Sequence, residues 1–408
     1  MDNTFCYFFY KYCTTLVIYS HLAYHLTISK QMGRILSIVI FSVPVIVASG
    51  QDTLRFSGQL SSWSNVNSGS DLPVWGGIRY IPQVNYGITL GSAGRFDGEV
   101  SANIFGNAGL RPFDSLTITG NIKPYRTWIR YSSDQLEIRL GLQKLNFGSA
   151  SMLRPLMWFD QMDPRDPLQL TDGVWGLLVR YYFLNNANIW LWGLYGNNER
   201  RGWETVPVNR KIPELGGRVQ LPVPGGEAAL SFHHRVADSR EMGTEISPYD
   251  RIPENRIGFD AKWDLKAGLW IESSFTHKSR DLGILTNQLI MNAGIDYTFA
   301  AGNGIYVAFE QLLVTYDQKP FTFSNNISFS LLTLTYPVGL FDRLSTIFYY
   351  NWTDNRVYSF INWQRQFDRI MFYVMAYWNP ESFQLPAKTA TQNIFAGKGV
   401  QLMFVFNH

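Results

Sequence analysis

From about residue 52 to its end, the chain is built of segments of about ten residues in which apolar and polar side chains alternate. In the segment 256–265, Ile257, Phe259 and Trp263 fall on one face, while charged and small residues fall on the other. This period of two is typical of a strand, because successive side chains of a strand point to opposite faces. Each strand therefore has an apolar face that must be covered by a protein core or by lipid.

The composition indicates that lipid, and not a protein core, covers the apolar faces of the strands. Aromatic residues make up 15% of the chain and charged residues only 16%, whereas about a quarter of the residues in soluble domains are charged. Such a chain suits an all-β transmembrane barrel, in which an outer apolar band is bordered by aromatic girdles. An aromatic-rich soluble β-protein is the alternative.

Aromatic residues near the predicted strand ends fit such girdles, and a sugar-stacking slide inside the barrel is a second interpretation of them. These residues are Trp263, Tyr350, Trp352, Trp363 and Trp378.

Residues 32–50 are predicted to be a secretory signal peptide. Arg34 supplies the positive start, 35–47 is largely apolar, and the small residues 48–50 offer a cleavage site. Residues 1–31 fit poorly upstream of a signal and are interpreted as a doubtful leader, with translation beginning at Met32. A membrane anchor in this region is the competing interpretation.

Removal of residues 1–50 would leave residues 51–408 as the mature barrel. Both cysteines, Cys6 and Cys13, fall in the removed part, so no disulfide is expected in the mature chain. Three bases and one acid would be removed, which leaves the mature chain nearly neutral and gives no indication of a nucleic-acid partner.

Eighteen strands are predicted, and sixteen is the alternative count. The predicted strands are 53–63, 76–90, 94–105, 123–132, 135–147, 173–183, 187–196, 214–222, 226–236, 255–265, 268–278, 285–299, 303–316, 325–337, 342–352, 355–364, 368–378 and 397–406. Tight turns follow nearly every even strand, and most connections after odd strands are longer. This parity is typical of antiparallel up-and-down barrels of the bacterial outer membrane, with short periplasmic turns and both termini in the periplasm.

A barrel of this size encloses more space than the wall side chains can fill, so something must narrow its channel. The connection 148–172 is the best candidate, because its Met, Leu, Trp and Phe side chains would be badly placed in solvent. We expect this loop to fold inward and form a charged eyelet. The predicted eyelet residues are the loop acids Asp160, Asp163 and Asp166 and the wall arginines Arg126, Arg130, Arg139 and Arg180. These groups could select solutes by charge, or could pair only to hold the loop in place.

The segment Arg139-Leu140-Gly141-Leu142-Gln143 with Phe147-Gly148 resembles an Arg-x-Gly-x-Gln segment of alginate-export-type and related porin families. The broader organisation resembles bacterial outer-membrane porins over nearly all of 52–406. The porin resemblance implies passive passage of small hydrophilic solutes. Inward acids such as Asp97 and Glu99 argue against a polyanionic solute. The last strand, which ends in Phe406, Asn407 and His408, resembles the C-terminal strand that the barrel assembly machinery recognises.

Enzymatic and metal-binding signals are weak. No histidine has metal-ligand spacing with a second ligand, so neither a metal nor another cofactor is expected. His277 and Ser279 form a His-x-Ser pair that could act as a base and a nucleophile on lipid, although no orienting partner is identifiable in the sequence.

The sequence therefore predicts a non-enzymatic diffusion channel in the outer membrane, with outer-membrane lipid, a small hydrophilic solute and the barrel assembly machinery as partners, and self-association open. The alternatives are a closed structural or assembly-associated barrel and, third, a lipid-acting serine hydrolase.

Overall fold

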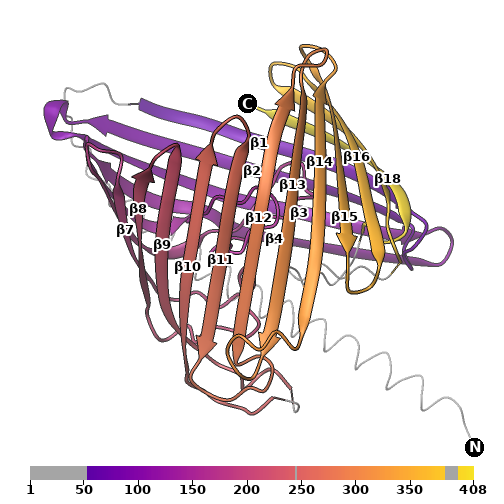
Figure 1. Ribbon diagram of the computed structural model, residues 1–408. Helices are drawn as coiled ribbons and strands as arrows, with labels where there is room; N and C mark the ends of the chain where they lie inside the picture. The colour runs from indigo at the N-terminus through magenta and orange to yellow at the C-terminus, as the bar shows by residue number, and fades with distance from the viewer. Residues whose placement is uncertain (1–52, 244–245, 382–393) are drawn as a thin grey trace, which may run out of the picture. The chain divides into compact units, whose positions relative to one another are not determined.

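The computed structural model describes residues 53–243, 246–381 and 394–408, so the predicted leader and signal peptide lie outside the described residues. Eighteen antiparallel strands form one sheet (Figure 1). The first nine are β1 Thr53–Asn67, β2 Val74–Thr89, β3 Arg95–Arg111, β4 Ser115–Ser132, β5 Leu136–Gln143, β6 Val174–Tyr182, β7 Asn188–Leu194, β8 Glu214–Val223 and β9 Gly226–Ala237. The others are β10 Ile252–Asp264, β11 Gly268–Lys278, β12 Asn287–Phe299, β13 Ile305–Asp317, β14 Asn326–Pro337, β15 Asp342–Asn351, β16 Arg356–Gln366, β17 Ile370–Trp378 and β18 Lys398–Asn407.

The sheet closes on itself. Each strand pairs with its neighbours in sequence, and β1 pairs with both β2 and β18. In this closing pair, Leu60 lies opposite Tyr80 on one side and opposite Phe406 on the other. Closure satisfies the backbone groups of the outermost strands and removes the free sheet edge. The predicted barrel and the predicted strand number of eighteen are both confirmed.

The apolar face of the strands points outward. On β10, Ile257 is 54% exposed, whereas Asp260 on the opposite face is 2% exposed. This distribution is the reverse of that in a soluble sheet and is expected of a barrel whose exterior faces hydrocarbon. The fold and its apolar exterior therefore place the chain in the outer membrane. Among the described residues, no helix has both the length and the apolar character of a membrane span.

The main departure from the predicted boundaries lies between β3 and β4. The segment 106–122 was expected to be a connection, but these strands continue to Arg111 and from Ser115, and only residues 112–114 join them. The sequence prediction missed this extension because the segment is rich in glycine. The two strands support each other through their mutual ladder, which runs from Arg95↔Ser132 to Arg111↔Ser115.

The chain ends by closing the barrel seam. Gly58 and His408 exchange two backbone hydrogen bonds of 3.0 Å, and the His408 ring lies 3.0 Å from the Tyr80 hydroxyl through its Nε2 atom. A side chain at position 58 would collide with this ring, since a Cβ there would lie 2.6 Å from the same nitrogen. The two residues beyond Phe406 therefore extend the last strand pair.

The outward position of Ile257 gives a direct test of the orientation. Ile257→Arg should destabilise the barrel in lipid by about 2–4 kcal/mol, because a guanidinium near the bilayer midplane loses its hydration. The free energy of unfolding in phospholipid vesicles measures this cost. Ile257→Ala, which keeps the position apolar, should cost less. Equal stability of the arginine variant and the wild type would contradict an exterior in contact with lipid.

Candidate functional site

The loop 148–172 leaves β5 and crosses the barrel interior to strands on the far wall. Its deepest anchor is Glu310 on β13, eight strands further round the eighteen-stranded sheet. The Glu310 carboxylate accepts the backbone N–H groups of Ser151, Met152 and Leu153 at 3.1, 2.9 and 2.7 Å. A carboxylate can accept several such bonds at once, so one wall side chain fixes three consecutive residues of the loop.

A second wall carboxylate, Glu272 on β11, holds both sides of the same turn. It accepts the N–H groups of Ala150 at 2.8 Å and Leu156 at 2.6 Å. Beside it, the Trp158 ring nitrogen donates to the Ser274 hydroxyl at 2.8 Å. These contacts use the polar inner faces of β11 and β13 to bind backbone, and they hold the loop inside the barrel.

Apolar packing covers the next part of the wall. Leu153 and Met157 of the loop pack in one buried cluster with Phe329, Tyr349 and Phe360, which point inward from β14, β15 and β16. The inner face of these strands is therefore partly apolar, a feature that the expected polar lumen did not include. Trp352 and Trp378, two of the predicted girdle residues, lie on the exterior of the barrel, where they are 56% and 64% exposed.

The loop acids do not face the wall arginines as predicted. Asp160 pairs with Arg154 at 3.0 Å, and Asp163 pairs with Arg165 at 2.7 Å, so both partners belong to the loop itself. These short-range pairs form because the loop carries its own bases at close sequence spacing. These ion-pair partners of Asp160 and Asp163 are thus loop bases, and not the wall arginines to which the alternative interpretation assigned the loop acids.

Asp166 also interacts within the loop, where it accepts the Leu168 N–H at 2.9 Å. Burial raises the pKa of Asp166, while the nearby Arg79 on β2 opposes this rise. Among the three predicted eyelet acids, Asp166 thus has a basic group of the barrel wall, Arg79, near enough to act on its carboxyl.

Three of the four predicted arginines gather on one wall around Glu137 of β5. Arg139 lies 3.0 Å from this carboxylate, and Arg130 and Arg180 each lie 3.5 Å from it. Arg130 also forms a bidentate pair with Asp97 at 3.0 and 2.8 Å. We call these five residues the arginine cluster. They come together because β3–β6 are neighbours and their inward positions share one level of the sheet.

Aromatic rings orient the cluster. The guanidinium of Arg180 lies 3.8 Å from the centre of the Trp190 ring, and that of Arg139 lies 4.8 Å from the centre of the Trp128 ring. Stacking of this kind holds a guanidinium in place while its edge stays free for hydrogen bonds. Arg126 lies apart from the cluster and donates to the Thr171 carbonyl of the loop at 2.9 Å.

A second charge network lies on β8–β11, and the sequence did not predict it as a site. It is almost sealed from solvent: Arg235 is 0% and Glu254 is 1% exposed. Its members are Arg201, Glu204, Glu214, His233, Arg235, Glu254, Arg256 and Lys278. Strand alternation indicates the inward members, but Glu204 comes from the connection 195–213, whose position alternation cannot predict.

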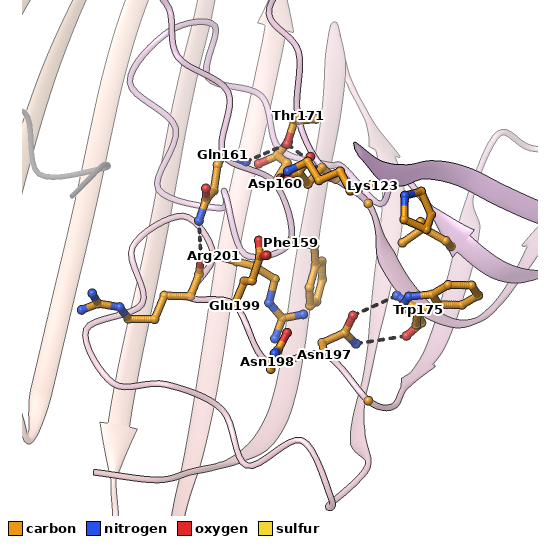
Figure 2. A pocket seen from close by; sticks show the side chains of 16 residues that line it. Lys123, Phe159, Asp160, Gln161, Thr171, Trp175, Asn197, Asn198, Glu199 and Arg201 are labelled. Atoms are coloured by element: carbon orange, nitrogen blue, oxygen red, sulfur yellow. Dashed lines mark hydrogen bonds and ion pairs between the residues drawn. The ribbon is translucent and has the colours of Figure 1, made fainter. Parts of the chain in front are cut away.

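Between the end of the loop and the connection 195–213 lies a pocket of about 210 Å³ (Figure 2). Lys123 and Asp172 pair across one side of it, and Gln161 donates its backbone N–H to the Thr171 hydroxyl at 2.9 Å. Gln161 also bonds the carbonyl of Arg200, which ties the loop to the connection. The pocket combines charges of both signs with amides, as expected of a hydrated passage or vestibule.

The His-x-Ser pair is only partly organised. His277 Nδ1 lies 2.7 Å from Asn287 Oδ1 on the adjacent strand, so the structure supplies an amide partner that the sequence did not reveal. Within the described residues, however, no hydrogen bond joins Ser279 to His277, and Ser279 contributes its backbone N–H to the Pro253 carbonyl. The nucleophile contact that a hydrolase needs is absent from this arrangement.

Comparison with known proteins identifies the fold. No protein-family model matches the chain, and no curated protein matches its sequence. Among solved structures, Pseudomonas aeruginosa OccD3 (OpdP) matches with a TM-score of 0.54 at 11% identity, over 90% of this chain and 96% of that chain. Acinetobacter baumannii OccAB1 matches with a TM-score of 0.53 at 9% identity, over 88% and 97%.

Vibrio cholerae OmpT, an outer membrane protein in a trimer form, matches with a TM-score of 0.51 at 11% identity, over 88% of this chain and 99% of that chain. At these identities the likeness concerns the fold alone. The chain thus has the closed barrel fold of bacterial outer-membrane porins.

The anchoring role of Glu310 can be tested by Glu310→Gln. Loss of the charge should weaken three hydrogen bonds to the loop and destabilise the protein by about 1.5–3 kcal/mol, the range for bonds to charged groups. Limited proteolysis should then cleave within 148–158, a segment whose hydrogen bonds to the wall should protect it in the wild type. Thr333→Val, a change at a buried inward position of β14, is the control. An unchanged proteolysis pattern in Glu310→Gln would contradict the anchor.

Proposed function

We propose that this protein is an outer-membrane porin-like channel for passive diffusion of small hydrophilic solutes. One observation carries the proposal: the barrel combines an apolar exterior with charged inner side chains that remain partly open to water. The side chains of Arg130 and Arg139 are 29% and 15% exposed. Charged groups on an inner wall are tolerated only where water or paired charges surround them.

The passage would run along the β2–β6 side of the barrel. The loop 148–172 packs against β11–β16 and also, through Trp158 and Phe159, against Trp192 of β7. The buried network of Arg235 and Glu254 closes the side of β8–β11. The arginine cluster keeps partly exposed side chains beside these contacts, and the space between the cluster and the loop is left to contact solutes.

The solute selectivity would come from this wall. The cluster carries three bases against two acids, so a weak preference for anions is expected at low ionic strength, where screening is small. In this proposal the eyelet is the gap between the inward loop and the arginine cluster. It differs from the predicted eyelet in that Asp160 and Asp163 form ion pairs with Arg154 and Arg165 of the loop.

The channel function is tested by conductance in planar lipid bilayers. Discrete, reproducible current steps of the refolded barrel are expected, because a hydrated passage admits ions as well as solutes. Complete silence from a barrel with native heat-modifiable mobility on gels would contradict the proposal. That result would support a closed structural barrel, and liposome swelling with sugars, amino acids and organic anions would then also be absent.

Selectivity gives a residue-level prediction. Arg139→Glu and Arg180→Glu should each shift the reversal potential in a salt gradient toward cation selectivity, since each changes the cluster by two charges. Arg240→Glu, on an external loop and 60% exposed, is the matched control. Unaltered reversal potentials in both cluster variants would remove the cluster from the conducting path.

A further inference from the structure

The outer face of the barrel carries a groove of about 640 Å³ over β16, β17, β18 and β1. Its shape follows from the strand register. Phe372 of β17 lies opposite Phe404 of β18, and Phe404 lies opposite Ser62 of β1. In the neighbouring row, Leu402 lies opposite Ser64. In each row a large side chain lies beside a serine on β1. Because the serine side chains are small, they leave a depression on the apolar exterior.

A charged pair marks the end of this groove near the short turns. Arg365, which lines the groove, lies 3.7 Å from Asp342, and their side chains are 44% and 22% exposed. Short turns face the periplasm in barrels of this class. The pair therefore lies at the level of the headgroups of the periplasmic leaflet, and the groove runs from it along the hydrocarbon-facing surface.

A second cavity, of about 500 Å³, adjoins the groove at this rim. Phe367 lines both cavities. The rim cavity is lined by polar and charged side chains, among them Asp342, Arg343 and Gln366. The apolar groove thus adjoins the polar rim cavity, and the Arg365–Asp342 pair lies close to their junction.

We propose that these two cavities together seat one zwitterionic glycerophospholipid of the periplasmic leaflet. An acyl chain fills the groove beside Phe372 and Phe404, where an empty space would forfeit dispersion contacts. The phosphate pairs with the Arg365 guanidinium, the side chain best suited to phosphate oxygens. The headgroup ammonium then lies near Asp342. A neutral diacylglycerol offers neither a phosphate for Arg365 nor an ammonium for Asp342.

A lipid fits this site better than a second copy of the chain. A protein partner would have to place both an apolar side chain in the groove and a charged pair at the rim, in one fixed geometry. A phospholipid joins the two chemistries in one flexible molecule. The inference concerns the exterior and is independent of the proposed channel: conductance tests the lumen, and lipid retention tests the groove.

The test is native mass spectrometry of the full detergent-purified barrel titrated with phosphatidylethanolamine. The wild type should retain one molecule of phosphatidylethanolamine more tightly than any further molecules that bind. Ser62→Phe/Ser64→Leu, which fills the groove, should weaken this binding at least tenfold. Arg365→Gln should reduce the preference for phosphatidylethanolamine over a diacylglycerol of the same chains by a similar factor. Ser273→Phe, on the outer face of β11, is the control and should bind like the wild type.

Two results would overturn the proposal. Equal retention of the lipid by wild type and Ser62→Phe/Ser64→Leu would show that the groove is not the seat. A wild-type oligomer that dissociates in this double variant, with no lipid bound to either, would assign the groove to a protein interface instead. Both variants lie on the lipid-facing surface, and the heat-modifiable mobility of each shows whether the barrel has folded.

Discussion

The structure depends on one constraint: in hydrocarbon, backbone N–H and C=O groups have no water to bind and must pair with each other. The pairing of β1 with β18 meets this requirement, since it turns a sheet with two free edges into a closed barrel. Closure then fixes the side chains, because each strand must present alternate residues to lipid and to the interior. Ile257 therefore faces outward and Asp260 inward.

The interior is organised by the charges that closure forces inward. On the far wall, Glu272 and Glu310 find their partners in the backbone of the loop 148–172. On β8–β11 the charges pair with one another under the connection 195–213, and on β3–β6 they surround Glu137. These three groups of charged side chains differ in how much they are exposed to water. The β3–β6 wall keeps a cluster of charged groups in partial contact with water, and the proposed passage is placed there for that reason.

The sequence predicted the period, the strand number and the inward loop, because each depends on local alternation, turn residues or composition. It could not predict the partners of the loop acids. Asp160 and Asp163 were assigned to wall arginines, whereas Arg154 and Arg165 of the same loop bind them. Pairing across a lumen depends on the three-dimensional path of the loop. The β3–β4 extension was missed because mutual pairing, and not the propensity of its glycine-rich segment, stabilises it.

In this barrel, adjacent residues of a strand face water and lipid in turn. Both cysteines of the sequence, Cys6 and Cys13, precede the barrel, so single cysteines can be placed in a variant that lacks both. In vesicles, Arg139→Cys should react with a water-soluble maleimide, while Leu140→Cys should resist it and carry a fluorophore that lipid-borne quenchers reach. Equal maleimide reactivity at both positions, or lipid quenching at position 139, would show that the two positions do not face water and lipid in turn.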